Sequence, residues 1–250
     1  MQKKPLNFAH RGFSGKYPEN TMLAFQKAFE VGVDGIEIDI QLTKDQELIV
    51  IHDTTVNRTT DGKGYVKDKT LNELQQLNAA HKFPEISNEE IIPTLKEYFE
   101  WIKEKPLVTN IELKTNVFEY PGIEEKVIKL IQEYQLQDTI IFSSFNHYTI
   151  KKLKELDSTI KCGLLSSDWL VDFGEYAKKV GVECVHPAHY TLQNPIVLNE
   201  LLEKQLEINT WTVNKEEQMR SLIQAGVTSI ITNYPDKLNN IFKEQSGEFF

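Results

Sequence analysis

The sequence predicts an α/β protein folded as a (β/α)₈ barrel, also called a TIM barrel. Two observations favour this fold class. Short β-rich runs alternate with helical patterns along the chain, which indicates parallel strands covered by helices. The chain has 250 residues, and such barrels commonly form one domain of about that length. An open doubly wound sheet is the alternative architecture.

The strand candidates are short runs rich in β-branched and aromatic residues. We expect nine, at residues 6–10, 35–42, 48–52, 108–113, 139–143, 160–165, 182–186, 208–213 and 229–232. Nine is one more than the barrel requires. The second and third runs are joined by residues 43–47 alone, and a parallel crossover needs about a dozen residues. These two runs are therefore predicted to form an antiparallel hairpin, turning near residues 45–46 and bringing His52 opposite Asp39.

Helical periodicity separates the strands. The predicted helices cover residues 21–31, 95–103, 123–134, 147–156, 171–180, 196–204, 215–225 and 235–243. Asn20 and Thr21 precede the first helix and Asn214 precedes the seventh, as expected of N-terminal caps. Three glycines follow last turns, where a left-handed residue usually ends a helix: Gly32, Gly181 and Gly226.

Residues 54–93 do not follow the alternation. They are polar and turn-rich, with one weak helix at 71–77. A structureless loop of that length is unusual inside a compact domain. We therefore expect a catalytic barrel formed by residues 1–53 and 94–250, and a small insertion, residues 54–93, that caps the barrel mouth.

The composition argues against several classes of protein. Lys and Arg total 28 against 37 Asp and Glu, a net charge of −9, and no basic patch typical of a nucleic-acid binder is visible. No apolar run approaches the ~18 residues of a membrane helix, and no signal peptide is recognisable. We expect a cytoplasmic protein. Cys162 and Cys184 lie in apolar stretches and are expected to be reduced core thiols.

Acidic side chains mark two of the predicted barrel strands. Glu37 and Asp39 are two residues apart and share one face of their strand, while isoleucines occupy the other face. Glu112 lies near the end of the next barrel strand. Three carboxylates without a cysteine suit a hard divalent cation such as Mg²⁺ or Ca²⁺. The alternative is that Glu37 and Asp39 lie on a solvated strand edge.

Histidines and cations end the same strands. His10 and His52 can supply one general base and one general acid near neutral pH. Arg11 is suited to a forked grip on phosphate oxygens and Lys114 to a point charge, although each could instead pair with a carboxylate. A cation-assisted pocket of this composition favours the chemistry of a phosphate ester.

The motifs at these positions resemble those of bacterial, cytoplasmic glycerophosphodiester phosphodiesterases. The matching stretches span nearly the whole chain: His10-Arg11-Gly12, Pro18-Glu19-Asn20-Thr21, residues 37–43, residues 52–60, Glu112-Leu113-Lys114, Ser143-Ser144-Phe145, residues 211–214 and residues 226–235. The resemblance implies a TIM barrel with a small insertion after the strand of His52. It also implies a divalent metal at the three carboxylates and catalytic roles for both histidines.

The activity implied by the resemblance is metal-dependent hydrolysis of a glycerophosphodiester to sn-glycerol 3-phosphate and an alcohol. We assign His10 as the base and His52 as the acid. Arg11 and Lys114 are expected to bind the phosphate, and Trp211 the glycerol or alcohol portion. The nucleophile is water or the substrate's own glycerol hydroxyl. The expected partner is a small molecule, without nucleic acid and without stable membrane insertion.

Some positions have more than one interpretation. Asn233 stands where the family usually has aspartate in a Thr-Asp-x-Pro pattern, and it is expected to cap the last helix. Glu19 could orient Arg11 or simply belong to a helix start. His186 could contact substrate or be structural.

Two other functions remain open. One is a phospholipase C- or D-like enzyme acting on lysolipids or phosphoinositides. Such an enzyme should expose an apolar rim, and the insertion offers only Tyr65 and Phe83, which favours a water-soluble substrate. The other is a barrel that binds phosphate metabolites without catalysis.

Overall fold

The computed structural model describes residues 4–86 and 89–247. Nine strands form one sheet in the order β1-β9-β8-β7-β6-β5-β4-β2-β3, and β1 also pairs with β2. This additional pairing closes eight parallel strands into the predicted barrel and leaves β3 outside, antiparallel to β2. The described strands are β1 (Leu6–His10), β2 (Gly35–Leu42), β3 (Leu48–Val50), β4 (Val108–Leu113), β5 (Ile140–Ser144), β6 (Lys161–Ser166), β7 (Cys184–Pro187), β8 (Glu207–Thr210) and β9 (Ser229–Thr232).

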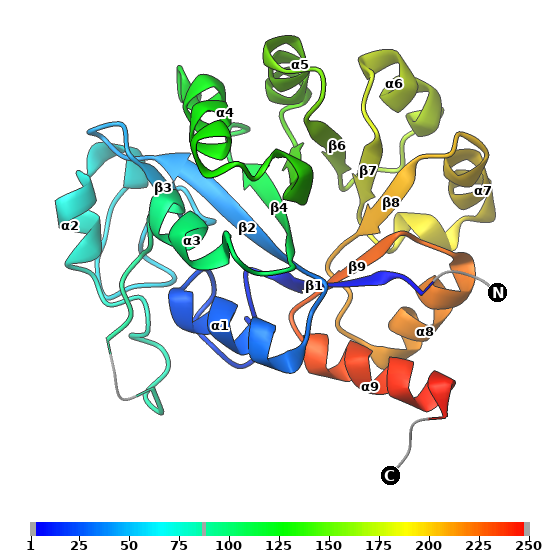
Figure 1. Cartoon of the computed structure of the whole chain (residues 1–250), viewed down its shortest axis with the longest axis horizontal. Helices are drawn as coiled ribbons and strands as arrows, with labels where there is room; N and C mark the ends of the chain where they lie inside the picture. Colours follow the sequence, from blue (N-terminus) through cyan, green and yellow to red (C-terminus); the bar gives the residue numbers. More distant parts are fainter. Residues whose placement is uncertain (1–3, 87–88, 248–250) are drawn as a thin grey trace.

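Helices surround the strands (Figure 1). The described α-helices are α1 (Met22–Val31), α2 (Leu71–Gln75), α3 (Leu95–Ile102), α4 (Ile123–Tyr134), α5 (His147–Leu156), α6 (Phe173–Val180), α7 (Pro195–Glu203), α8 (Glu216–Ala225) and α9 (Pro235–Ser246). Across the described ranges, none of them is long and apolar enough to cross a bilayer.

The predicted helix caps are right in most cases and wrong at Asn214 and Asn233. Thr21 caps α1 by accepting a hydrogen bond from the Ala24 amide, and the three predicted glycines end their helices with left-handed backbone. Asn214 does not cap α8, whose N-cap is Lys215. Its side-chain oxygen instead accepts a hydrogen bond from the Asn233 amide at 3.0 Å, because the neighbouring strand end lies closer than the helix.

The hairpin of β2 and β3 differs from the prediction by one residue. The Ile51 amide donates to the Asp39 carbonyl at 2.9 Å, so Ile51 rather than His52 lies opposite Asp39. The turn of the hairpin is centred on Asp45 and not between residues 45 and 46. This shifts the pairing of β3 with β2 by one residue. His52 therefore lies beyond the end of β3, in the segment that follows.

The barrel interior changes from apolar to polar along the strands. Four residues from β1, β5, β7 and β9 form a buried cluster inside it: Phe8, Ile141, Cys184 and Ile231. Two residues later on the same faces come four polar residues: His10, Ser143, His186 and Asn233. The apolar layer thus supports a polar layer at the carboxyl ends of the strands. Both cysteines are buried and free, as expected.

The segment 54–93 packs against β3 on the outside of the barrel. Its apolar side chains form a separate buried cluster with two isoleucines of residues 49–51; these side chains are Val56, Val66, Leu74, Ala79 and Ile92. Helix α2 of this segment lies at one end of the molecule (Figure 1). The division of the chain into a barrel and a capping insertion stays a prediction.

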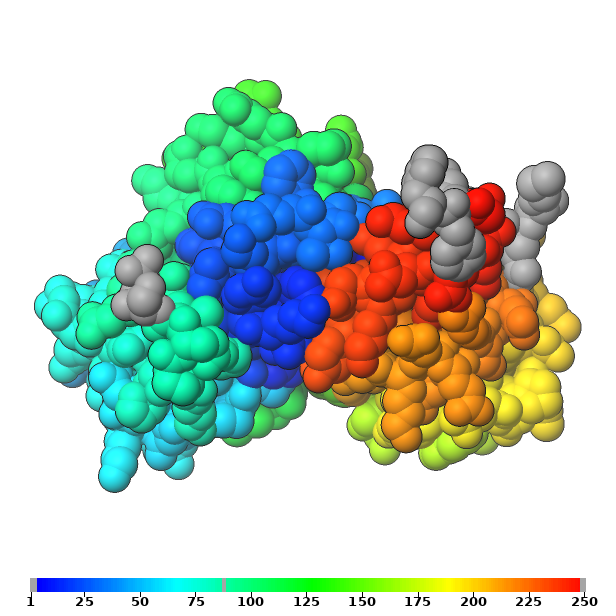
Figure 2. Space-filling view, turned by 90° about the horizontal axis from the view of Figure 1, so that it is seen from below, coloured from blue at the N-terminus to red at the C-terminus, as the bar shows by residue number. Residues whose placement is uncertain are grey.

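The first and the last strand of the chain lie side by side in the barrel wall. Strand β1 pairs in parallel with β9, and Figure 2 shows the blue N-terminal and red C-terminal parts of the chain side by side. This closure brings residues more than two hundred positions apart into one site.

Candidate active site

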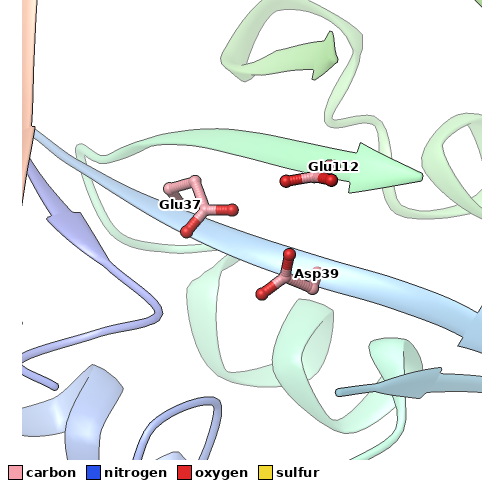
Figure 3. A group of neighbouring side chains, drawn as sticks. All are labelled: Glu37, Asp39 and Glu112. Atoms are coloured by element: carbon pink, nitrogen blue, oxygen red, sulfur yellow. The ribbon is translucent and has the colours of Figure 1, made fainter. Parts of the chain in front are cut away.

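Three carboxylates converge at the carboxyl ends of β2 and β4. Parallel pairing sets Asp39 beside Glu112, and Glu37 lies two residues earlier on the same face as Asp39. One oxygen from each of the three lies within 4.8 Å of the others, and all three residues are buried (Figure 3). The alternative of a solvated strand edge is therefore wrong.

The electrostatics of this group are those of a cation site. Burial raises the pKa of Glu37 well above its usual range, and Asp39 adds to the shift. Burial also raises the pKa of Glu112. Within the described part of the chain, Asp39 Oδ1 is buried without a hydrogen-bond partner. An all-carboxylate set with an unused buried oxygen fits a hard divalent cation.

Two basic side chains border the carboxylates. Lys114 Nζ lies 2.6 Å from Glu112 Oε1 and 3.8 Å from Asp39 Oδ1. Arg11 Nε lies 3.3 Å from Asp39 Oδ2. Burial opposes ionisation of Asp39, yet Arg11 and Lys114 hold the pKa of its carboxyl below its usual range. Both predicted phosphate-binding residues therefore lie at the edge of the acidic group.

The chain makes a tight turn at Arg11 and Gly12, directly after β1. Arg11 and Gly12 both have left-handed backbone, with φ of 56° and 76°. A Cβ atom at Gly12 would lie 2.7 Å from the carbonyl carbon of Ala24, so only glycine fits against α1 here. The Arg11 amide donates to Glu37 Oε2 at 3.0 Å, which ties the turn to the acidic group.

His10 lies between the acidic group and the last strand. Its Nδ1 atom donates to Asn233 Oδ1 at 2.6 Å, and its Nε2 atom lies 3.8 Å from Glu37 Oε2. Burial, assisted by Arg11, lowers the pKa of His10 to about 3, so the ring is neutral at pH 7. The prediction that Asn233 caps α9 is wrong, because the N-cap is Tyr234. The side chain of Asn233, directly after β9, binds His10 instead.

His52 reaches the same site from the segment after β3. Its Nδ1 atom lies 2.7 Å from Asp53 Oδ1, and this hydrogen bond is the main reason that the pKa of Asp53 is lowered. The preceding residue, Ile51, donates its amide to the Asp39 carbonyl at 2.9 Å, so His52 lies beside the acidic strand. The predicted proximity of His52 to the acidic strand is therefore correct although its register is not.

Trp211 adjoins the site through Phe145. Its Nε1 atom donates to the His186 carbonyl at 2.7 Å, and its ring meets the edge of Phe145 with centroids 5.5 Å apart. The Phe145 ring lies 5.9 Å from Lys114 Nζ. His186 is fully buried, which decides in favour of its structural interpretation.

The interpretation in which Glu19 orients Arg11 agrees with the structure, because Arg11 Nη1 donates to Glu19 Oε1 at 2.9 Å. Sequence reasoning missed other residues that hold the site together. Asn20 Nδ2 donates to Asp39 Oδ2 at 2.9 Å, and Asp53 and Arg58 form an ion pair beside His52. They stand within the motifs already noted, but their side chains show no spacing typical of a site. Asn233 was noticed only as a departure from a pattern.

The fold and the site together define a class of protein, a TIM-barrel enzyme with a metal-type acidic centre and two histidines at its strand ends. The chain belongs to the glycerophosphoryl diester phosphodiesterase family, whose model matches residues 10–237. A glycerophosphodiester phosphodiesterase of Caldanaerobacter subterraneus is 45% identical over 96% of this chain and 99% of its own. One of Bacillus altitudinis is 41% identical, covering 95% of this chain and 98% of its own.

A solved structure supports the same placement. The phosphodiesterase of Oleispira antarctica, in complex with the product sn-glycerol-3-phosphate, has 29% sequence identity and a TM-score of 0.87. The match covers 96% of this chain and 97% of that chain. The family resemblance inferred from the motifs is thus confirmed.

Proposed function

We propose that this chain hydrolyses glycerophosphodiesters to sn-glycerol 3-phosphate and an alcohol. The observation that carries the proposal is the buried group of Glu37, Asp39 and Glu112, which lies between His10 and His52. The names of the relatives and the product bound to the Oleispira antarctica structure support the same reaction. We further propose that the enzyme acts in the cytoplasm on a small-molecule substrate.

The charges on the described residues suit a phosphodiester. A Mg²⁺ or Ca²⁺ ion held by the three carboxylates would polarise the phosphate and lower the pKa of the attacking oxygen. Arg11 offers its guanidinium and Lys114 its ammonium group to the phosphate oxygens, on which negative charge grows during the reaction. Trp211 and Phe145 offer apolar rings beside Lys114 for the carbon skeleton of the substrate.

The hydrogen bonds of the histidines suit different roles. Because His10 donates from Nδ1 to Asn233, its neutral ring carries the lone pair on Nε2, where it can accept a proton. This proton comes from water or from the glycerol hydroxyl of the substrate. His52 is held at Nδ1 by Asp53, which leaves Nε2 to protonate the departing alkoxide. We therefore assign His10 as base and His52 as acid.

The segment 54–93 begins directly after His52, and we propose that it forms the wall beside the leaving alcohol. Its nearest charged side chain is Arg58, which contacts Asp53. The segment also carries Lys63, Lys67, Asp68 and Lys69. Such a wall suits a small polar alcohol, such as choline or ethanolamine, better than an acyl chain.

The test is release of glycerol 3-phosphate from glycerophosphocholine, with EDTA and after readdition of Mg²⁺ or Ca²⁺. We expect EDTA to abolish turnover, and Glu37→Gln to abolish both turnover and the rise in melting temperature on metal addition. Glu244→Gln, which removes an exposed carboxylate far along the chain, is the matched control and should behave like the wild type. Full turnover in EDTA would contradict the metal-dependent reaction.

A second candidate substrate class is favoured by one surface feature. Among the described residues, five apolar side chains are more than half exposed, and all follow the carboxyl ends of barrel strands: Val117, Tyr148, Trp169, Val171 and Ile196. The strand–helix connections and the first turns of α5 and α7 supply these side chains. An apolar rim of this kind favours a lysolipid substrate.

A further inference from the structure

An unbroken series of ion pairs joins the two sides of the site. Arg58 donates to both oxygens of Asp53, from Nε at 2.7 Å and from Nη2 at 3.0 Å. It also donates to both oxygens of Glu19, at 2.6 and 2.7 Å. Asp53 in turn accepts from His52 Nδ1 at 2.7 Å, and Glu19 accepts from Arg11 Nη1 at 2.9 Å. The order is His52, Asp53, Arg58, Glu19, Arg11.

The geometry of this series requires arginine at its centre. Four hydrogen bonds leave one planar guanidinium toward two carboxylates, a fork that the single ammonium group of lysine cannot reproduce. The signs of charge alternate along the series, so each carboxylate lies between cationic or donor groups. Burial opposes the ionisation of Glu19, but Arg58 and Arg11 keep its pKa below the usual range.

Arg58 lies partly in solvent. Its side chain is 45% exposed, so solvent weakens the contribution of its ion pairs to stability. The residues that it joins are functional candidates from three separate stretches of the chain. A partly exposed residue with four directed hydrogen bonds into one site is suited to holding side chains in place.

We propose that Arg58 is a positioning residue, which orients His52 through Asp53 and Arg11 through Glu19. This inference rests on the proposed function, in which His52 is the acid and Arg11 binds the phosphate. Through Asp53, Arg58 fixes the ring of His52 with Nδ1 bound and Nε2 free. Through Glu19, it holds the guanidinium of Arg11 beside Asp39. Among the described residues, Arg58 pairs with Asp53 and Glu19 and forms no ion pair with the acidic group.

The two arms of the series predict different kinetic effects. Displacing an acid slows departure of a poor leaving group, such as choline, far more than departure of p-nitrophenol, which needs no proton. Displacing a phosphate-binding arginine slows both reactions equally, because the phosphate is the same. Loss of Asp53 should therefore depend on the leaving group, loss of Glu19 should not, and loss of Arg58 should combine the two effects.

The experiment compares kcat/KM for glycerophosphocholine and for the p-nitrophenyl ester of glycerol 3-phosphate. We expect Asp53→Asn to lower cleavage of glycerophosphocholine on the order of 10–100-fold and cleavage of the nitrophenyl ester much less. Glu19→Gln should lower both by one common factor. Arg58→Gln should lower both, and glycerophosphocholine more; Arg58→Lys should not restore the rate, because it lacks the fork.

A matched control removes another ion-paired surface arginine. Arg220 pairs with Glu244 on the helices α8 and α9, and its side chain is 39% exposed. Arg220→Gln should leave both rates unchanged, and urea unfolding should show that Arg58→Gln remains folded under the assay conditions. Arg58→Gln that leaves both rates at wild-type level, or lowers them by the same factor, overturns the proposal.

A spectroscopic measurement separates the inference from the function. Imidazole ¹⁵N spectra, with His52 assigned through a His52→Gln variant, should show a protonated Nδ1 hydrogen-bonded to Asp53 in the wild type, and this signature should be lost in Arg58→Gln. If the wild type cleaves neither ester but this spectral change is present, the proposed function is refuted and the positioning role of Arg58 stands. An unchanged His52 spectrum in Arg58→Gln refutes the positioning role whatever the activity.

Discussion

The hydrogen-bond partner of His10 is the neutral amide of Asn233, and this affects the pKa of His10. The hydrogen bond to Asn233 raises the pKa of His10, but it carries no charge, whereas burial and the adjacent Arg11 lower it to about 3. A carboxylate at the same position would stabilise the imidazolium form much more strongly. The amide therefore orients the ring, and Nε2 stays unprotonated at neutral pH.

His186 should make folding sensitive to acid. It is fully buried, with Nε2 accepting from Asn209 Nδ2 at 3.2 Å, and burial lowers its pKa to about 3. The unfolded chain binds a proton near pH 6.5, so stability is lost as pH falls from about 6.5 toward 3. Between pH 7 and pH 5 this histidine should cost about 2 kcal/mol of unfolding free energy.

The measurement is urea unfolding of the wild type and His186→Gln at both pH values. The variant lacks the titrating ring, so its unfolding free energy should fall less on acidification, by about 2 kcal/mol. Its absolute stability is expected to be lower at both pH values, because the native ring packs against Gly163. Equal losses on acidification in the two proteins would show that His186 is protonated in the folded state.

At the scale of elements, one glutamine holds the segment that carries His52. Gln41 on β2 is fully buried, and its Nε2 atom donates to the carbonyls of Ile51, His52 and Asp53 at 2.9, 3.2 and 2.8 Å. Its Oε1 atom accepts from the Tyr120 hydroxyl at 2.9 Å. This arrangement substitutes for the strand pairing that ends with β3.

Gln41→Leu should loosen that segment. Several backbone carbonyls lose their donor, so we expect a loss of about 2–3 kcal/mol in unfolding free energy and a lower kcat as His52 moves. Gln75→Leu, which removes a partly exposed glutamine near Glu97 of helix α3, should change stability by less than about 0.5 kcal/mol. Wild-type kcat in Gln41→Leu would mean that other contacts hold His52.

The parts of the site that could be predicted from sequence are those fixed by local periodicity. Glu37 and Asp39 had to share a face because strand side chains alternate. The partner of Asn233 could not be predicted, since His10 lies 223 residues away and meets it only through closure of the barrel. The hairpin register failed for a smaller reason, because the position of the turn within five polar residues has no strong sequence signal.

At the scale of the whole molecule, the exposed apolar side chains around the mouth test the substrate class. The proposed function expects glycerophosphocholine to be cleaved much faster than lysophosphatidylcholine. If the rim contacts lipid, Trp169→Ser with Val171→Ser should lower kcat/KM for lysophosphatidylcholine micelles about tenfold, through lost apolar contact, and leave glycerophosphocholine cleavage unchanged. The measurement is kcat/KM for both substrates in both proteins.

The control for the rim changes an apolar residue away from the mouth. Leu202 is 40% exposed near the end of helix α7, and Leu202→Ser should affect neither substrate. Equal or faster cleavage of the lysolipid by the wild type would move the assignment to the second candidate. A rim variant that loses both activities equally would mean that these side chains support the loops rather than meet lipid.

Closure of the barrel by β1 and β9 has a consequence for how the protein is made. Both histidines, the three carboxylates and both phosphate-binding cations are encoded before residue 115, whereas the strand that completes the wall spans Ser229–Thr232. A nascent chain therefore carries nearly all its reactive groups on a sheet whose β1 edge stays open, and open edges attract other chains. The ribosome must release almost the entire polypeptide before that edge is paired, so chaperone protection matters most late in translation.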